Sequence, residues 1–204
     1  YDETDFKAAL QIAFEHDNTV LIEKFIPGRE FRIFIINDEV VGILHRVPAN
    51  VTGDGVLNIG QLIDRKNEDP LRGKGYRTPL EKIRKGREEE MFLKQQGMDF
   101  NTVPKEGEVV YLRENSNIST GGDSIDFTDD IDDSYKAIAV EAAKALNVKI
   151  TGLDMMIQDI HAPATPDNYA IIEMNFNPAI HIHCYPFKGK NRHLNHKMIR
   201  ALGF

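Results

Sequence analysis

The chain has 204 residues, 41% of them apolar and 28% charged, which is the composition of a globular protein with a sizeable hydrophobic core. A net charge of −7, from 32 acidic and 25 basic side chains, argues against general binding to nucleic acid or to an anionic membrane. No apolar run is long enough to span a membrane, and the first residues are acidic and lack a signal-type stretch. The single cysteine, Cys184, cannot form an internal disulfide, so we expect a cytoplasmic protein.

The beginning of the chain predicts one helix followed by strands. Apolar residues recur at helical spacing over residues 6–13, and acidic residues lie in the first turn. Three β-rich runs follow at residues 20–26, 31–36 and 40–44. The short polar segment 37–39 is predicted to join the last two runs as a hairpin.

Glycines and prolines divide the next segment into short pieces. Residues 80–95 predict a helix interrupted by a glycine, and the charge run at residues 87–90 is expected to form a solvated helix face. Residues 109–112 predict a strand that leads into a polar loop at residues 113–126.

The last part of the chain contains clear periodicities. A helix is predicted to begin near Tyr135 and to stop at Asn147, with apolar residues along one side. Residues 150–157 and 169–175 predict two strands, and residues 194–202 predict a final short helix. Because helices and strands mix without a strict βαβ alternation, the sequence predicts an α+β fold.

Three polar residues in this last strand pair predict a metal site. Glu173 and Asn175 are two residues apart on one strand, so their side chains leave the same face, and Asp154 interrupts the preceding apolar strand. Charged residues in apolar strands are costly to bury unless they are paired or bind a cation. Two carboxylates and a carboxamide suit Mg²⁺ shared with phosphates better than a closed zinc site. The alternative for each acid is an exposed position on a half-buried strand.

Two further segments are candidates for binding a nucleotide or another anion. Arg113 offers a planar guanidinium suited to phosphate or carboxylate, and the small residues 119–122 allow backbone amides to approach an anion. Pro27, Gly28 and the acid Glu30 follow an apolar segment and have the composition to line a base and hold ribose hydroxyls. Each pattern is also common in ordinary polar turns.

A pair of histidines, His181 and His183, leaves two interpretations open. On a strand, His-x-His could direct both imidazoles at one Zn²⁺, as in a zinc-dependent hydrolase. The alternative is that these rings line a substrate pocket beside Asn175 or are incidental. A serine hydrolase is poorly supported, because no serine lies in a Gly-x-Ser-x-Gly elbow.

Taken in order, these segments resemble the ATP-grasp ligases. The matching elements are Glu-Lys-Phe-Ile-Pro-Gly-Arg-Glu at 23–30, Arg-x-Pro at 46–48, Arg-x-Asn-x-Asn-x-Ser-Thr-Gly-Gly at 113–122, Gly-Leu-Asp at 152–154 and Ile-Glu-Met-Asn-Phe-Asn-Pro at 172–178. Their order and spacing are more specific than any one of them. The segments 46–55 and 67–73 are similar to a subgroup that contains cyanophycin synthetase and glutathione-forming ligases.

The resemblance implies a fold in which ATP lies between two α+β subdomains and phosphorylates a substrate carboxylate, after which an amine attacks the acylphosphate. By position, Glu23, Lys24, Phe25, Ile26 and Glu30 would bind ATP, and Asp154, Glu173 and Asn175 would bind two Mg²⁺, with Mn²⁺ as the substitute. Arg113 and Arg46 would be catalytic by stabilising the transferring phosphoryl group. The substrates would be held by Asn117, Ser119, Thr120, Gly121, Gly122 and His181.

The resemblance also implies how the chain is organised. Residues 1–204 would be the downstream part of one ATP-grasp domain, with 1–47 ending the lid subdomain and forming the adenine hinge. Residues 48–108 would be a subgroup-specific insertion, and 109–204 the antiparallel-sheet subdomain with the metal and substrate sites. The lysine-bearing phosphate loop of the family lies upstream of the hinge, so we expect the chain alone to lack ligase activity.

The function that the resemblance implies is ligation of γ-glutamylcysteine to glycine, in a chain that also carries a γ-glutamate–cysteine ligase domain upstream. The alternative within the family is a cyanophycin-type amino-acid ligase. The alternatives from other classes are a zinc-dependent hydrolase using His181 and His183 and a non-catalytic nucleotide-binding module. The expected partners are the small molecules γ-glutamylcysteine and glycine, and the assembly considered is a homodimer with a second copy of the chain. No nucleic acid or membrane is expected.

Overall fold

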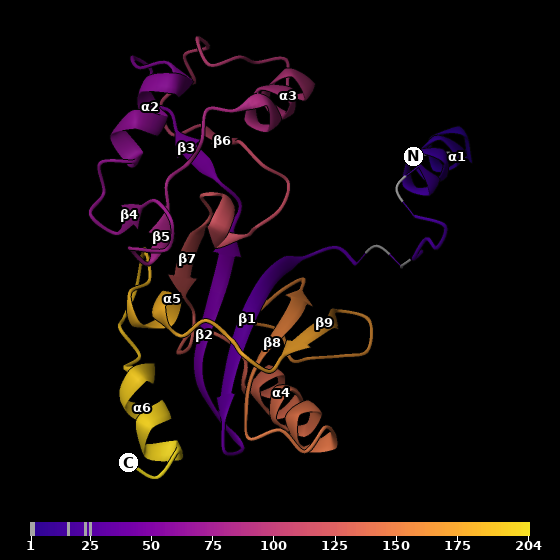
Figure 1. The fold of residues 1–204 in the computed structure, drawn as a ribbon, viewed down its shortest axis with the longest axis vertical. Coiled ribbons are helices and arrows are strands. Elements are labelled where there is room, and N and C mark those ends of the chain that lie inside the picture. The colour runs from indigo at the N-terminus through magenta and orange to yellow at the C-terminus, as the bar shows by residue number, and fades with distance from the viewer. Residues whose placement is uncertain (1–2, 16, 23, 25) are drawn as a thin grey trace.

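A five-stranded antiparallel sheet forms the centre of the computed structural model, which describes residues 3–15, 17–22, 24 and 26–204 (Figure 1). The strands are β1 (Arg29–Ile36), β2 (Glu39–Val47), β7 (Asp123–Asp126), β8 (Ile150–Ile157) and β9 (Tyr169–Asn175). Their order is β7-β2-β1-β8-β9, and every neighbouring pair is antiparallel. The predicted strands at 150–157 and 169–175 and the α+β class are confirmed.

The β1–β2 hairpin sets which side chains share a face of this sheet. Its connection is the two-residue turn Asn37 and Asp38, whose φ angles of 48° and 65° match the left-handed conformation that tight hairpins favour. The predicted hairpin is therefore confirmed. Phe31 lies opposite His45 and Arg32 lies opposite Leu44, and Phe31 and Arg32 leave opposite faces of the sheet.

Helix α4 (Asp133–Ala145) covers one face of the sheet. Its Tyr135, Ala139 and Ala143 join a buried core with the apolar side chains of β1 and β8, and Asp132 caps its first turn by accepting from the amide of Ser134. The helix ends at Ala145, and the predicted stop residue, Asn147, follows the cap residue Leu146 with a left-handed φ of 52°. Leu146, expected on the packed side, is exposed instead because it follows the last helical turn.

The opposite face is covered only in part. The short helix α5 (His181–Cys184) and helix α6 (Leu194–Ala201) bury Phe34, Ile36 and Val41 at one end of the sheet. The other end of this face carries charged side chains from β1, β2 and β8. The predicted C-terminal helix is confirmed.

Residues 49–112 contain a second, smaller core that does not merge with the first. Its elements are β3 (Asn50–Thr52), α2 (Ile59–Lys66), β4 (Arg72–Gly73), β5 (Leu80–Glu81), α3 (Arg87–Gln95) and β6 (Val109–Tyr111). Strand β6 pairs with β3, which confirms the predicted strand at 109–112 to within one residue. Helix α2 was not predicted, although Asn58 and Gln61 form a capping box at its start.

Three sequence-based predictions of local structure are wrong. No strand forms among the described residues of 20–26, because no neighbouring strand is there to pair with them, and Leu21 and Ile22 are exposed. Residues 80–86 are not helical, since β5 pairs with β4 and α3 begins only after Gly86. The expected loop at 113–126 contains a 3₁₀ turn, η1 (Ile118–Thr120), and strand β7.

The chain boundary expected at residue 47 does not separate two packed units. Strands β1 and β2, before that residue, are central strands of the sheet that also holds β7, β8 and β9. The amino-terminal helix α1 (Glu3–Phe14) is confirmed, and Figure 1 shows it apart from the sheet. No helix in the described part of the chain combines the length and hydropathy needed to cross a membrane.

Candidate active site

Asp154 lies at the centre of the charged end of the sheet and is 2% exposed. The strand register places Arg32 of β1 opposite it on one side and Glu173 of β9 opposite it on the other. Arg32 donates from Nη2 to Oδ2 of Asp154 over 2.7 Å, and its Nε pairs with Oδ1. A bidentate pair of this kind fixes the carboxylate in both position and orientation.

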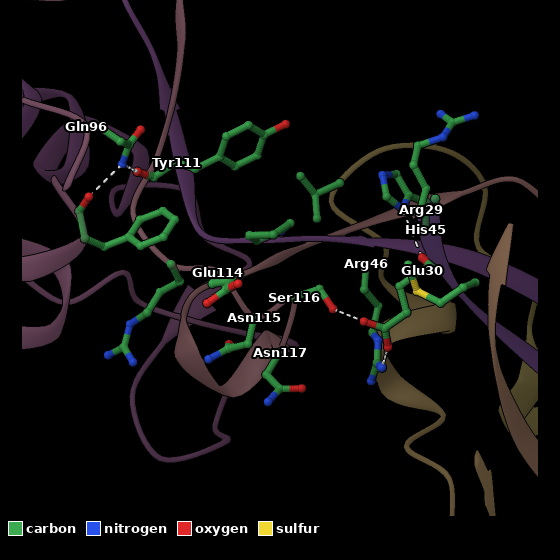
Figure 2. Close-up of a pocket in the computed structure, with 16 residues that line it drawn as sticks. Arg29, Glu30, His45, Arg46, Gln96, Tyr111, Glu114, Asn115, Ser116 and Asn117 are labelled. Atoms are coloured by element: carbon green, nitrogen blue, oxygen red, sulfur yellow. Dashed lines mark hydrogen bonds and ion pairs between the residues drawn. The ribbon is translucent and has the colours of Figure 1, made fainter. Parts of the chain in front are cut away.

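Arg46 of β2 joins Asp154 to a second carboxylate, that of Glu30. Its Nη2 lies 3.0 Å from Oδ2 of Asp154 and also forms an ion pair with Oε1 of Glu30. Ser116 donates its hydroxyl to the other oxygen of Glu30. Figure 2 shows Arg46, Glu30 and Ser116 together among the residues that line a cavity. The Arg46 guanidinium therefore links two carboxylates that lie far apart in sequence, and Ser116 joins them through Glu30.

Glu173 and Asn175 lie on the same face of β9, beside Asp154, and are less buried than it is. Asn175 donates from Nδ2 to Oε1 of Glu173 over 2.9 Å. No group of three His, Cys, Asp or Glu side chains within the described ranges is arranged to hold a metal ion unaided. Two carboxylates and one carboxamide nevertheless offer only hard oxygen ligands, which fits a divalent cation that is completed by phosphate oxygens.

Two cavities flank this charged centre. The larger has a volume of about 650 Å³ and is lined by Gly28, Arg29, Glu30, His45, Arg46, Val47, Pro48, Phe92, Gln96, Tyr111, Arg113, Glu114, Asn115, Ser116, Asn117 and Met156. The smaller has a volume of about 180 Å³ and is lined by Arg32, Arg46, Tyr76, Pro79, Glu81, Asn117, Ile118, Ser119, Ala179, His181 and Ile182. Arg46 and Asn117 line both, so the two cavities meet at these side chains.

The loop at residues 117–122 is closed on itself and does not present a row of free amides. The amides of Thr120 and Gly122 donate to the carbonyl of Asn117, and that of Gly121 to Ile118. The amides of residues 120–122 are therefore not available to an anion as expected, because the 3₁₀ turn uses them internally. Gly121 has φ of 95°, and a Cβ there would lie 2.8 Å from Cα of Ile83, so its lack of a side chain lets the loop pack closely.

Arg113 is placed beside the larger cavity but is already paired. Its Nε and Nη2 lie 2.6 Å from Oε1 of Glu89, and it also contacts Glu88. Glu89 is 1% exposed, so the charge run at 87–90 is not the wholly solvated face expected from the sequence. The reason is a long-range partner: the buried carboxylate of α3 is matched by a guanidinium from after β6.

The histidines do not form a zinc site of the kind that the strand interpretation required. Residues 181–184 form helix α5, so His181 and His183 point in different directions. His181 lines the smaller cavity, whereas His183 is buried against Phe34. Burial lowers the pKa of His183 to about 3 and that of His181 below its usual value. The zinc-hydrolase alternative is thereby overturned.

The hinge residues are described only in part. Glu23 and Phe25 lie outside the described residues, Lys24 is exposed and Ile26 is half-buried. Glu30, by contrast, is fixed by Arg46 and Ser116 as described above. Neither Arg32 nor Ser116 was predicted as a site residue, yet Arg32 interrupts an apolar strand just as Asp154 does, and this signal is visible in the sequence.

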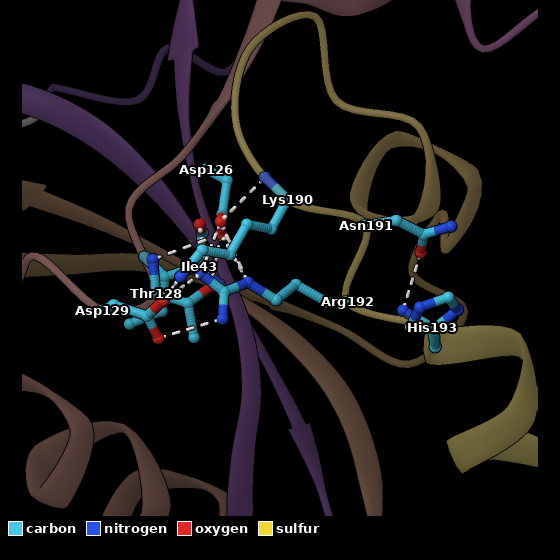
Figure 3. Close-up of polar contacts among 8 residues, drawn as sticks. All are labelled: Ile43, Asp126, Thr128, Asp129, Lys190, Asn191, Arg192 and His193. Carbon is cyan, nitrogen blue, oxygen red and sulfur yellow. Dashed lines mark hydrogen bonds and ion pairs between the residues drawn. The ribbon is translucent and has the colours of Figure 1, made fainter.

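The C-terminal segment that carries His181 is fastened to the sheet by a second cluster of charges. Arg192 donates from Nε and Nη2 to the carboxylate of Asp126 and from Nη1 and Nη2 to that of Asp129 (Figure 3). Lys190 pairs with Asp129, and Thr128 donates its hydroxyl to Asp126. Burial, which alone raises the pKa of Asp126, is outweighed by hydrogen bonds from Arg192 and Thr128, so this pKa lies below its usual value.

Comparison with known proteins relates this arrangement to a family. No family model matches the chain. The glutathione biosynthesis bifunctional protein of Desulfotalea psychrophila is 64% identical over 199 residues, 98% of this chain, and that of Clostridium perfringens is 57% identical over 202 residues, 99% of this chain. The crystal structure of a bifunctional glutathione synthetase from Pasteurella multocida, at 46% identity, superposes with a TM-score of 0.82 over 98% of this chain.

The chain belongs to the ATP-grasp family. It spans 26% of the length of the two bifunctional relatives and 28% of the Pasteurella structure, so its fold is part of an ATP-grasp fold. The predicted family and the predicted partial fold are confirmed.

Proposed function

We propose that this chain provides the metal and substrate sites of an ATP-dependent ligase that joins γ-glutamylcysteine to glycine. The observation that carries the proposal is the position of Arg46, whose guanidinium touches Glu30 and Asp154 and lines both cavities. Glu30 is proposed to hold the ribose of ATP, and Asp154 to face the phosphates. A phosphoryl group moving between the two cavities would pass this guanidinium.

The residues of the site divide into three roles in this proposal. Asp154, Glu173 and Asn175 hold two Mg²⁺ or Mn²⁺ ions, which when bound neutralise charge on the phosphates. Arg46 stabilises charge on the transferring phosphoryl group, and Arg113 does so from the other side of the larger cavity. Asn117, Ser119 and His181 face the smaller cavity and orient the carboxylate substrate, while Thr120, Gly121 and Gly122 shape the loop behind them.

The bifunctional relatives support a longer context for this chain. They are named for glutathione biosynthesis, and the chain spans about a quarter of their length. We therefore propose that a γ-glutamate–cysteine ligase domain precedes it in the same polypeptide and supplies γ-glutamylcysteine. The lysines that would bind the phosphates of ATP from the lid are proposed to lie upstream as well.

The test uses the full-length product of the gene with Mg-ATP, γ-glutamylcysteine and glycine, and measures phosphate release together with glutathione. We expect release that requires both substrates and a fall of at least about a hundredfold in kcat for Arg46→Lys, because a compact ammonium on a flexible chain does not reproduce the planar guanidinium that is held at this position. Arg65→Lys, the same change in an exposed pair with Asp54, is the matched control. Equal turnover with aspartate or arginine as the amine would favour a cyanophycin-type ligase, and no turnover with any amine would refute the proposal.

A further inference from the structure

The smaller cavity has a wall that comes from the segment 48–108, called the insertion here, and one buried side chain holds that wall in place. Tyr76, Pro79 and Glu81 of the insertion line the cavity together with Asn117 and Ser119 of the loop. The cores of the insertion and of the main sheet are separate, so apolar packing alone does not fix the distance between these walls. Polar contacts across the junction must do so.

Arg72 makes these contacts. Its side chain is fully buried, and its Nη1 donates to the carbonyl of Glu81 over 2.8 Å and to that of Gly121 over 3.0 Å. Its Nη2 pairs with the carboxylate of Asp123, the first residue of β7. One planar guanidinium therefore contacts the insertion wall, the loop wall and the sheet at the same time.

The surroundings of Arg72 make this junction rigid. Lys66 donates to the second oxygen of Asp123 over 2.6 Å, and Asn50 donates to the same oxygen over 3.0 Å. The ring of Phe187 lies under both cations, 5.5 Å from Cζ of Arg72 and 5.2 Å from Nζ of Lys66. Burying such an ion cluster contributes little net stability, whereas it strongly selects one arrangement of the groups that it joins.

The wall itself is also fixed in shape. The carboxylate of Glu81 accepts from the amides of Gly75 and Tyr76 over 3.2 and 2.5 Å, so the turn that carries Tyr76 is tied back to β5. The loop wall cannot move independently, because Gly121 packs directly on Ile83 of the insertion. A change in the position of the Arg72 side chain would therefore shift both walls of the smaller cavity, the one that carries Tyr76 and the one that carries Ser119.

We propose that Arg72 is a positioning residue that sets the width of the smaller cavity, and thereby the affinity and selectivity for the carboxylate substrate, without touching that substrate. This inference rests on the proposed function of the same site. It assigns to the insertion a specific task, which is to close one side of the substrate cavity. ATP is proposed to enter the larger cavity, whose lining does not include the 72–81 segment.

The kinetic test compares Arg72→Met and Arg72→Lys in the full-length gene product. We expect Arg72→Met to raise the KM for γ-glutamylcysteine at least about tenfold and to leave the KM for ATP within about twofold, since only the smaller cavity changes. Arg72→Lys should recover part of the loss, because it keeps the ion pair with Asp123 but not both carbonyl contacts. Arg65→Met, an exposed arginine of the neighbouring helix α2, should behave as wild type.

Parallel increases in both KM values would overturn the inference, because they would indicate general loosening. An unchanged KM for γ-glutamylcysteine would overturn it as well. Hydrogen exchange in the same protein separates this outcome from failure of the proposed function. Arg72→Met should speed exchange in peptides covering residues 74–82 and 117–122 and leave α4 unchanged. If exchange is unchanged in Arg72→Met, the positioning role of Arg72 is refuted even if the enzyme is an active ligase. If the wild type has no ligase activity, the proposed function is refuted, and the exchange measurement still tests the positioning role of Arg72.

Discussion

Arg32 and Asp154 face each other across β1 and β8, with Nη2 of the arginine 2.7 Å from Oδ2 of the aspartate. Both side chains are nearly inaccessible to solvent, at 8% and 2% exposure. We expect Arg32→Met to lower the free energy of unfolding by about 3 kcal/mol, because the buried carboxylate loses its bidentate partner and keeps only Arg46. Urea denaturation measures the change, and a second substitution, Asp154→Asn, should restore part of the loss. A full-sized loss in the double variant would contradict this account.

Substitution of Glu173 is expected to reduce activity strongly and stability only slightly. Its side chain is exposed beside Asn175, so Glu173→Gln should change the free energy of unfolding by no more than about 0.5 kcal/mol. Turnover of the full-length gene product should fall at least about a hundredfold, because one of the proposed metal ligands loses its charge. Glu39→Gln, an exposed acid at the start of β2, is the control that should retain activity. Near-normal turnover in Glu173→Gln would refute the metal role.

The buried histidines predict a loss of stability in mild acid. Burial lowers the pKa of His183 to about 3 and that of His45 to about 4, whereas both would titrate near 6.5 in the unfolded chain. The unfolded state therefore binds more protons below pH 6.5, and stability falls as the pH drops from 6.5 toward these lower values. Each histidine contributes up to about 1.4 kcal/mol per pH unit in this window.

Urea denaturation at pH 7, 6 and 5 measures this slope. His183→Leu should remove a large part of it, since His45 retains its share, and the double variant with His45→Phe should keep only the part that comes from His181, whose pKa burial also lowers. The carboxylates with lowered pKa values, such as Asp126, titrate below this window and do not obscure it. A slope that is the same in wild type and in His183→Leu would show that the ring is not buried in its neutral form.

The Arg192 cluster shown in Figure 3 should hold the C-terminal segment to β7. Arg192→Met leaves the carboxylate of Asp126, which is 4% exposed, without its guanidinium, and we expect a loss of about 3 kcal/mol. Limited proteolysis should then cleave preferentially within residues 185–204. Lys190→Met is the control, because Lys190 is 73% exposed and its pair with Asp129 contributes at most about 1 kcal/mol. An unchanged cleavage pattern would contradict the fastening role.

The sequence was most informative where local pattern and tertiary environment agree. The turn residues Asn37 and Asp38 and the apolar runs on either side predict the hairpin, and the apolar runs of β8 and β9 predict that strand pair. Residues 20–26 have the same local composition as a strand, but a strand requires a neighbour with which to exchange hydrogen bonds, and sequence composition does not report that neighbour.

Among the site residues, too, some could be recognised from the local sequence and others depend on partners that are distant in sequence. Asp154 could be recognised as a charge within an apolar strand, and Arg32 carries the identical signal. The burial of Glu89 could not be recognised, because its partner Arg113 follows 24 residues later and only the packing of α3 brings them together. Arg72 was visible only as part of a family motif, since its three partners come from β5, the 117–122 loop and β7.

The turn at Asn37 and Asp38 has a consequence for chemistry at the far end of the hairpin. Because successive side chains of a strand alternate between faces, the length of this turn and the one-residue bulge opposite Phe34 and Ile35 together decide whether Arg46 or His45 lies beside Glu30. One inserted residue that shifted β2 by a single position would exchange the two, placing an imidazole where the guanidinium now links both carboxylates. The charge beside Glu30 therefore depends on the strand register of this hairpin, which is set at an exposed turn and a bulge away from the site.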